Sequence, residues 1–378
     1  GGCILLHADY QEQKSIKQEI VKNSLERIGG LAGITEKIRP IIGKDVPFAY
    51  RGKGIFRLNH NGKKYNLGFM AEGSHNVTER CCTFLFPSQV NKLLAVLEEL
   101  LNNDYEELAA ATDRVMVKTA INSKELMLIL FIKKERLNQS VISAAENLYQ
   151  DLKNELKSTD SKLQVFGYSA DSGEPNPLYT NLQILSPNAV ITEKLAGTLY
   201  EISAASFFQV SPRQAEQMLL YIKELMAGKK HLQIIDAYSG IGTIGLALAD
   251  TAESVDCIEV VAEAVADAEK NCRLNNLQNV RCHCGKAEEL FGKVSKSRPT
   301  AQERLVIVDP PRKGCHKNLL QGILDFAAES VIYVSCNPST LGRDLAVLSQ
   351  KYNIESVQPI DFFPQSYHIE NVVLLKKR

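Results

Sequence analysis

The sequence lacks long hydrophobic runs, and it lacks the order of charged, apolar and small residues that marks a signal peptide. A membrane-spanning helix needs about 20 consecutive, mainly apolar residues, and a secretory leader needs an apolar region followed by a cleavage site. Neither pattern occurs in the 378 residues. We therefore expect a soluble, cytoplasmic protein that does not bind membranes, and no segment indicates an obligate protein partner.

The sequence also lacks net charge, because 44 Lys and Arg residues balance 44 Asp and Glu residues. This balance argues against a protein that holds nucleic acid by overall basicity. The charges are unevenly distributed, since residues 1–70 contain twelve Lys or Arg residues and six Asp or Glu residues. That end of the chain is the favoured electrostatic contact for a polyanion.

A regular cysteine framework is absent as well. The nine cysteines do not show the paired spacing of small secreted proteins, and such a set fits a reducing cytoplasm better than a disulfide scaffold.

The length of the chain is too great for a single compact core. The patterns predict an N-terminal helical segment at residues 1–42, a central α+β domain at 43–190 and a C-terminal domain at 191–378. In the first part a helix is expected from Asp9 to Ile28, ended by Gly29 and Gly30, with a Lys-rich outer face. Its apolar face is predicted to contain Ile16, Ile20, Val21, Leu25 and Ile28.

The C-terminal part alternates between strand-like and helix-like segments from about residue 213 onwards. Alternation of this kind predicts a doubly wound, mainly parallel α/β sheet. Two final strand-like runs, at 354–360 and 371–375, are joined by a short connection, which predicts an antiparallel hairpin that closes the sheet.

A glycine-rich turn follows the first strand of this domain. The segment Asp236-Ala-Tyr-Ser-Gly-Ile-Gly-Thr-Ile-Gly245 has the spacing G-x-G-x-x-G between a strand and a helix, and its glycines allow the backbone to approach a ligand closely. Glu259 ends the next strand, where a carboxylate can accept hydrogen bonds from ribose hydroxyls. The pattern suits a dinucleotide or S-adenosylmethionine. Asp236 favours the latter, because a carboxylate there would attract a cationic amino acid moiety and repel a pyrophosphate.

Two further strand ends have the residue types of a reactive site. The strand that ends at Asp309 is followed by Pro310-Pro311-Arg312, a rigid corner beside which a planar base could lie. The strand 330–335 is followed by Cys336, directly before a predicted helix, and the helix N-terminus is expected to lower the thiol pKa. Cys336 is therefore the candidate nucleophile, although a buried cysteine that fills a strand end is a common alternative. Glu370, before the last strand, is a candidate general base or a solvated charge.

Taken together, these motifs identify the chain as similar to the RNA 5-methyluridine methyltransferases, which methylate uracil in tRNA and in large-subunit rRNA. The resemblance covers nearly the whole chain. It implies an enzyme that uses S-adenosylmethionine and acts on RNA, with a central RNA-binding domain and a Rossmann-like methyltransferase domain. The segments that carry it are Ser206-Phe-Phe-Gln-Val210, the glycine turn at 236–245, Asp309-Pro-Pro-Arg-Lys-Gly314, Ser335-Cys-Asn-Pro338 with Thr340, Leu341, Arg343 and Asp344, and Phe363-Pro364 with His368 and Glu370.

The resemblance also assigns roles to individual residues. It implies that Cys336 is the nucleophile and Glu370 the base. The residues that it implies to contact S-adenosylmethionine, with the turn glycine included, are Gln209, Tyr238, Gly240, Glu259 and Asp309.

Some members of this family hold a 4Fe-4S cluster with a Cys-x(5)-Cys-Gly-Gly-Cys run and one later cysteine. Gly1-Gly2-Cys3 is similar to the end of that run, and Cys82, or Cys81, to the later ligand. By this similarity, 23S rRNA is favoured over tRNA as the substrate, with tRNA methylation as the alternative.

Two other functions compete with this interpretation. A DNA cytosine-5 methyltransferase also uses a Cys thiolate, but the nucleophile loop of those enzymes lies early in the fold and has Pro before Cys. A non-catalytic RNA-binding or ribosome-assembly protein with the same fold would not need Cys336 and Glu370.

Overall fold

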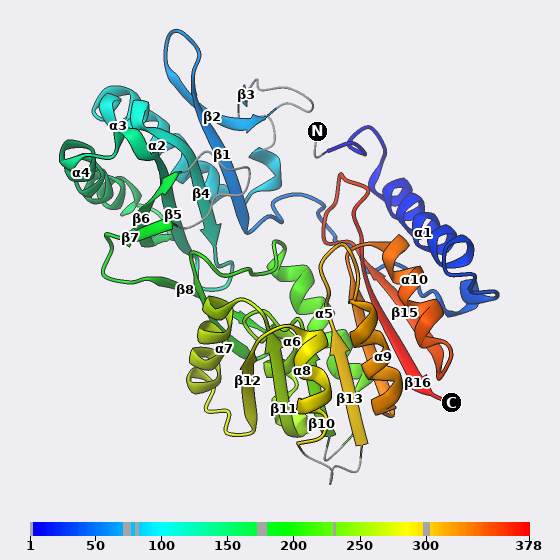
Figure 1. Cartoon of the computed structure of the whole chain (residues 1–378). Coiled ribbons are helices and arrows are strands. Elements are labelled where there is room, and N and C mark those ends of the chain that lie inside the picture. The colour runs from blue at the N-terminus through cyan, green and yellow to red at the C-terminus, as the bar shows by residue number, and fades with distance from the viewer. Residues whose placement is uncertain (1–2, 71–76, 80–82, 172–179, 230–231, 298–302) are drawn as a thin grey trace. The chain divides into compact units, whose positions relative to one another are not determined.

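The structure, a computed structural model, describes residues 3–70, 77–79, 83–171, 180–229, 232–297 and 303–378. The described chain divides into two compact units. The first contains residues 48–194 and 201–205, and the second contains residues up to 47 together with 195–200 and 206–378. The N-terminal helix therefore belongs to the same unit as the C-terminal sheet (Figure 1).

The first unit has an α+β fold around a sheet in which seven strands are described, in the order β3-β2-β1-β4-β5-β6-β7. Neighbouring strands are antiparallel except β5 and β6, which are parallel because helix α4 connects them. The strands are β1 (Lys53–His60), β2 (Tyr65–Met70), β3 (Val77–Glu79), β4 (Thr112–Thr119), β5 (Glu125–Lys133), β6 (Lys162–Asp171) and β7 (Thr180–Ile184), and the helices are α2 (Ser88–Asn103), α3 (Glu106–Ala111) and α4 (Gln139–Leu156). Two more strands, β8 (Val190–Leu195) and β9 (Thr198–Ser203), pair with each other.

The second unit confirms the predicted doubly wound sheet. Its described strands have the order β12-β11-β10-β13-β14-β16-β15, with parallel pairing from β12 to β14 and antiparallel pairing of β16 with β14 and β15. The strands are β10 (Leu232–Ala237), β11 (Ala252–Glu259), β12 (Val280–Cys284), β13 (Glu303–Val308), β14 (Ser330–Ser335), β15 (Tyr352–Ile360) and β16 (Glu370–Lys377). The helices are α1 (Tyr10–Arg27), α5 (Pro212–Leu225), α6 (Thr243–Ala247), α7 (Ala262–Leu274), α8 (Ala287–Val294), α9 (Lys317–Phe326) and α10 (Pro338–Leu348).

Helix α8 was not predicted from the sequence. It has only two turns, and the side chains that it buries are Ala287, Phe291 and Val294. An apolar stripe this short gives little periodic signal, and Gly292 within the helix weakens the helical pattern further.

One face of the second sheet is covered by α8, α9 and α10, whose apolar side chains form a single core cluster with the strands. Helix α1 adds Val21 and Leu25 to this cluster. The predicted apolar face of α1 was partly wrong, because the buried face contains Gln13 and Lys17 in place of Ile16 and Ile20, and Ile28 is exposed. The buried residues are spaced four apart, so they form one stripe along the helix, and one of the predicted outer lysines lies inside.

Helices α1 and α10 approach each other closely where two glycines meet. A Cβ atom on Gly342 would lie 2.9 Å from the Ser24 carbonyl oxygen, and one on Gly29 would lie 3.0 Å from the Gly342 carbonyl oxygen. Backbone atoms cannot move aside as a flexible side chain can. The two glycines therefore set how near α1 lies to the helix that follows Cys336.

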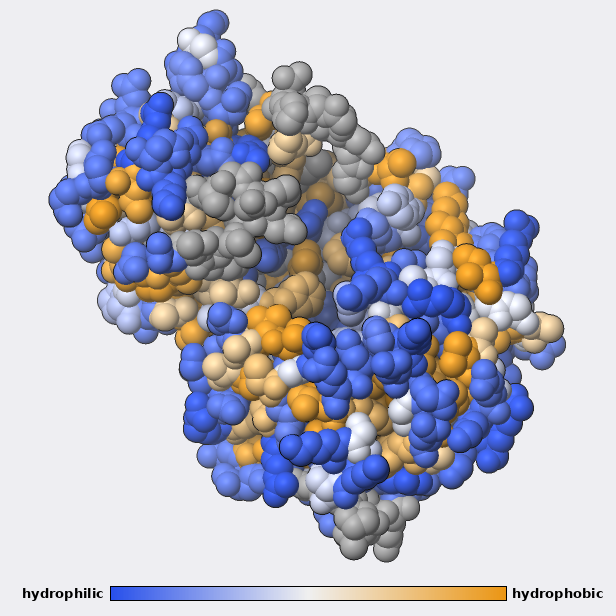
Figure 2. Space-filling model, viewed as in Figure 1, coloured by the Kyte–Doolittle hydropathy of each residue, from blue (hydrophilic) through white to orange (hydrophobic). Residues whose placement is uncertain are grey.

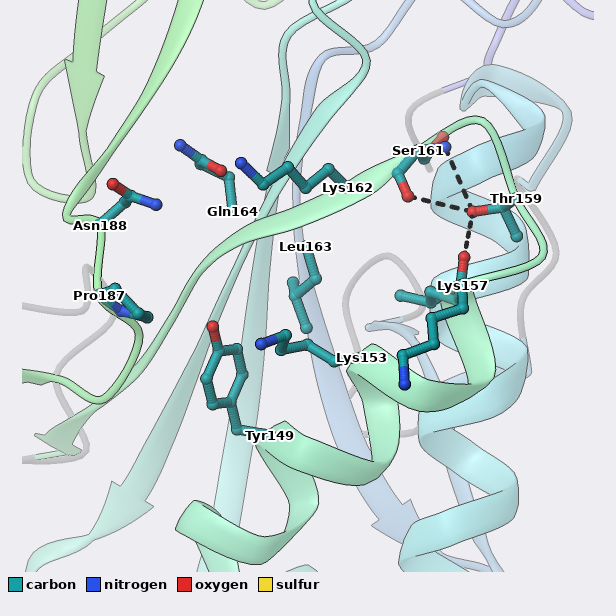
Figure 3. A pocket seen from close by; sticks show the side chains of 11 residues that line it. Tyr149, Lys153, Lys157, Thr159, Ser161, Lys162, Leu163, Gln164, Pro187 and Asn188 are labelled. Atoms are coloured by element: carbon teal, nitrogen blue, oxygen red, sulfur yellow. Dashed lines mark hydrogen bonds between the residues drawn. The ribbon is translucent and has the colours of Figure 1, made fainter.

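The surface visible in Figure 2 is mainly hydrophilic, with scattered hydrophobic patches. None of the described helices is long and apolar enough to cross a membrane. A hollow of about 310 Å³ lies in the first unit beside α4 and the start of β6, and its lining includes Tyr149, Lys153, Lys157 and Lys162 (Figure 3). The motifs of the predicted site lie in the other unit, so the hollow is separate from that site.

The glycine contact between α1 and α10 leads to a stability prediction. Gly342→Ala is expected to lower the free energy of unfolding by about 1–3 kcal/mol in urea titrations, because the new methyl group overpacks a backbone contact. Gly292→Ala in α8 is the control, since its Cβ meets nothing within 4 Å. It should raise the free energy of unfolding by up to about 1 kcal/mol through helix propensity alone. Equal effects of the two substitutions would contradict the close packing.

Candidate active site

Three parallel strands end at one edge of the second sheet and place three site residues there. Strand β10 is followed by Tyr238, β13 by Asp309 and β14 by Cys336. The strands pair in register up to these ends, and the Asp309 amide still donates to the Ala237 carbonyl oxygen at 3.4 Å. Ligands of open α/β sheets bind at this carboxyl edge.

Strand β16 brings Glu370 to the same edge from the opposite direction. It runs antiparallel to β14 and pairs Asn371 with Ser335. The Asn371 side-chain amide also donates to the Ser335 carbonyl oxygen at 3.4 Å. The next residues beyond this pair are Cys336 and Glu370, and the Glu370 carboxylate acts electrostatically on the Cys336 thiol. The structure thus brings together Cys336 and Glu370, which the sequence predicted separately.

The Glu370 carboxyl group is suited to hold and release a proton. Only 8% of the residue is exposed. Burial raises its pKa well above the ordinary value, the charge of Asp309 raises it further, and Arg312 acts in the opposite direction. Burial also raises the pKa of Asp309, to about 7. Carboxyl groups with pKa values near or above neutral pH are typical of sites that transfer protons.

The predicted lowering of the Cys336 pKa was wrong. Its thiol pKa is raised to about 11: burial is the largest cause, the carboxylates of Glu370 and Asp309 also raise it, and Arg312 and a backbone hydrogen bond lower it. The helix N-terminus does not dominate, because Asn337 intervenes and its own side chain caps α10 by accepting from the Ser339 amide at 3.1 Å. Burial of the thiol and the two nearby carboxylates therefore affect the Cys336 pKa more than the helix N-terminus does.

Arg312 is a site residue that the sequence analysis did not single out. Its charge acts on both Cys336 and Glu370. Its loop is held by α10, since Asn337 Nδ2 and Thr340 Oγ1 both donate to the Arg312 carbonyl oxygen, at 2.9 and 3.2 Å. The available signal was its place directly after Asp309-Pro-Pro.

Arg343 and Asp344 of α10 bind the segment 313–315, which follows Arg312. The fully buried Asp344 carboxylate accepts from the Cys315 amide at 2.8 Å and from the Tyr333 hydroxyl at 2.6 Å. Arg343 Nη2 donates to the Lys313 carbonyl oxygen at 2.9 Å. These bonds fix the segment after Pro311 relative to α10, and hence relative to Cys336.

The glycine turn leaves open space for a ligand. Gly240 has φ of 57° and nothing lies within 4 Å of where its Cβ would be. The neighbouring Tyr238 has φ of 63°, which is costly for a residue with a side chain. Its hydroxyl accepts from the His316 amide at 3.3 Å, which ties the turn to the loop after Asp309.

Asp236 is buried beneath the glycine turn. It is 1% exposed, and its Oδ2 accepts from the Gly245 amide at 2.8 Å. That bond stabilises the glycine turn from inside, while the buried Oδ1 has no hydrogen-bond partner among the described residues. Burial raises its pKa to about 7.

Glu259 ends β11 as predicted and faces the glycine turn. Its Oε2 accepts from the Gly240 amide at 3.0 Å, and its Oε1 accepts from the Val261 amide at 2.9 Å. Each oxygen retains further acceptor capacity for ligand hydroxyls. Gln209 lies half-buried between β9 and α5, and no described hydrogen bond joins its side chain to the other site residues.

The residues predicted as iron–sulfur ligands are only partly within the described chain. Cys81 and Cys82 lie outside it, and Cys3 is half-buried just before α1. Among the described residues no group of three or more His, Cys, Asp or Glu side chains is arranged to hold a metal. Of the predicted cluster ligands, only Cys3 lies within the described residues.

Comparison with known proteins places this site in a family. Residues 35–378 match the family described as tRNA (Uracil-5-)-methyltransferase. The chain belongs to this family. Curated relatives are described as uncharacterized RNA methyltransferases: one from Caldanaerobacter subterraneus subsp. tengcongensis is 36% identical over 100% of this chain and 82% of its own length, and one from Clostridium tetani is 33% identical over 99% and 80%.

A solved structure supports the fold. The Pyrococcus abyssi tRNA (uracil-54, C5)-methyltransferase, in complex with S-adenosyl-L-homocysteine, has a TM-score of 0.76 at 22% identity, covering 99% of this chain and 85% of its own. Family membership shows that the protein is an S-adenosylmethionine-dependent RNA methyltransferase.

The electrostatics of Cys336 predict how its reactivity depends on pH. Its alkylation by iodoacetamide, followed by peptide mass spectrometry, should accelerate steeply as pH rises from 7 to 10, because only the thiolate reacts. Glu370→Gln should make alkylation faster at each alkaline pH, since it removes an ionised carboxylate that raises the thiol pKa. The exposed Cys284 serves as the internal reference. A Cys336 rate that is already maximal at pH 7 would contradict the raised pKa.

Proposed function

We propose that the protein transfers a methyl group from S-adenosylmethionine to carbon 5 of a uridine in RNA, with Cys336 as nucleophile and Glu370 as base. The observation that supports this most strongly is the pairing of Ser335 with Asn371, the residues next to Cys336 and Glu370, together with the effect of the Glu370 charge on the Cys336 thiol. Methylation at carbon 5 needs a nucleophile and a base at one ring, whereas methylation of an amino group leaves a thiol without a role.

The chemistry starts from the low reactivity of carbon 5 of uracil. The Cys336 thiolate adds to carbon 6, and the ring electrons move to the carbonyl oxygen at carbon 4 to form an enolate. The enolate makes carbon 5 nucleophilic, so that it can accept the methyl group. Glu370 then removes the proton from carbon 5, the carbon 5–carbon 6 double bond re-forms, and the Cys336 sulfur leaves as thiolate. Burial of Glu370 favours this last proton transfer, because a raised pKa makes its carboxylate a stronger base.

The residues that would hold S-adenosylmethionine surround the glycine turn. A nucleoside with an amino acid tail fits this turn. Gly240 leaves open space, Tyr238 has a left-handed backbone conformation, and Glu259 offers a carboxylate. The Ser239 hydroxyl fits as well, since it is buried and has no hydrogen-bond partner among the described residues. We assign Gln209 and Asp309 to the same group. The bound molecule supplies an electrophilic methyl group on a sulfonium centre.

The uridine must leave its stack to reach this site. Base flipping costs a few kcal/mol, least where the nucleotide is already in a loop. We propose 23S rRNA as the substrate, on the similarity of Gly1-Gly2-Cys3 to the end of a cluster motif. Transfer RNA is the alternative, and the substrate printed for the Pyrococcus abyssi neighbour supports that alternative.

The direct test is incubation with tritiated S-adenosylmethionine and unmodified rRNA or tRNA transcripts, followed by nucleoside analysis. We expect label in 5-methyluridine from rRNA. Cys336→Ala should lose more than about 10³-fold in rate while S-adenosylmethionine binding, measured by calorimetry, stays within about twofold. Label from tRNA alone would reassign the substrate. Substantial activity of the Cys336 variant would exclude the nucleophile assignment.

A further inference from the structure

Helix α1 carries two buried polar side chains that no catalytic role explains. Gln13 is 1% exposed and Lys17 is fully buried, one turn apart on the inner stripe of the helix. Burying an amide and an ammonium group is costly unless each is hydrogen-bonded. The hydrogen-bond partners of Gln13 and Lys17 show which part of the protein they hold in place.

Both partners lie in the loop of residues 361–369, which joins β15 to β16. Lys17 Nζ donates to Asp361 Oδ1 at 2.6 Å and to the Phe363 carbonyl oxygen at 2.9 Å, and Asp361 is also fully buried. The hydroxyl of Tyr10, one further residue of α1, donates to Asp361 Oδ2 at 3.0 Å. A buried ion pair of this kind contributes little net stability but can define position.

Gln13 holds the middle of the same loop with two bonds to one residue. Its Nε2 donates to Gln365 Oε1 at 2.8 Å, and its Oε1 accepts from the Gln365 amide at 2.9 Å. Gln365 has φ of 72°, the left-handed region that favours glycine. A residue with a side chain persists there only where its surroundings hold it, at a cost of order 1–3 kcal/mol. Gln13 supplies that support.

The loop leads directly into Glu370. Its later part packs aromatic rings together, with Tyr367 and His368 at 4.4 Å and Phe363 and His368 at 6.0 Å between centroids. Helix α1 also touches the other half of the site, because Gly29 packs against Gly342 of α10, the helix that begins just after Cys336. In Figure 1, α1 runs beside both α10 and the loop before β16. One helix thus supports the segments next to both reacting residues.

We propose that Gln13 and Lys17 are positioning residues for the proton-transfer step: they hold the 361–369 loop in the strained conformation that shields Glu370 from water beside Cys336. This inference rests on the proposed function, since it assigns the role of α1 in that reaction. Neither residue touches the substrate in it.

The shielding matters because of the charges that face Glu370. Asp309, directly after β13, raises its pKa and Arg312 from the following loop lowers it. Cys336, directly after β14, lies at the same sheet edge, and His368 precedes Glu370 in the loop. A loosened loop would admit water, which favours the ionised carboxylate. The base would then have a lower pKa and a less defined position.

The test compares Gln13→Met with Gln11→Met in the full chain. Both changes replace a glutamine on α1 by an unbranched side chain, but Gln11 is exposed. The rate of 5-methyluridine formation is measured against pH at saturating RNA and S-adenosylmethionine. For Gln13→Met we expect a loss on the order of tenfold in rate and a shift of the acidic limb of the pH profile to lower pH. The KM for RNA should remain within about twofold.

Further variants keep the proposal falsifiable. Lys17→Met alone leaves Asp361 buried without its cation and can prevent folding, so Lys17→Met is combined with Asp361→Asn and should show the same shift as Gln13→Met. A Gln13 variant with the rate and pH profile of Gln11→Met would overturn the proposal, as would a uniform loss at all pH values that parallels a lower Tm. A wild-type protein that forms no 5-methyluridine would instead refute the proposed function.

Discussion

The pairing of Ser335 with Asn371 is the constraint on which the site depends. Strand β14 runs with the parallel strands and is followed by Cys336, while β16 is inserted beside it in the opposite direction and begins with Glu370. A shift of one residue in this register would turn the side chains to the other face and separate the two groups. The parallel part of the sheet adds Asp309 and the glycine turn at the same edge, so one backbone arrangement assembles residues that lie more than a hundred positions apart.

The electrostatics of the site follow from placing these groups at one sheet edge. Three acidic or thiol groups, Cys336, Glu370 and Asp309, share a desolvated edge, and each has a raised pKa. Arg312 is the nearby cation that counters this effect, and α10 holds its loop by two bonds to its carbonyl oxygen. The protein therefore keeps its nucleophile and its base protonated more readily than exposed groups would be. A binding partner with positive charge would shift both toward their reactive forms.

Much of this could be predicted from the sequence, and the errors have clear physical causes. Long strands such as β14 and the helices after them follow from periodicity, and the position of Cys336 at a strand end follows from its neighbours. The direction of its pKa shift could not be predicted, because it depends first on burial of the thiol and then on the charges of Glu370 and Asp309, which lie far from Cys336 in the sequence. The bond from Asp236 to the Gly245 amide could not be predicted, because the motif does not show that the carboxylate is buried beneath the turn. The polar stripe of α1 was missed because Lys17 looks like a surface residue until its partner Asp361 is known.

The central claim is that Cys336 bonds to the uracil and Glu370 releases it. The most direct measurement is incubation of Glu370→Gln with RNA and S-adenosylmethionine, followed by denaturing gel electrophoresis and mass spectrometry of the RNA-linked peptide. The account predicts a covalent adduct that accumulates, maps to Cys336 and contains the transferred methyl group, because the proton on carbon 5 can no longer be removed. No adduct, or an adduct at another cysteine, would contradict it.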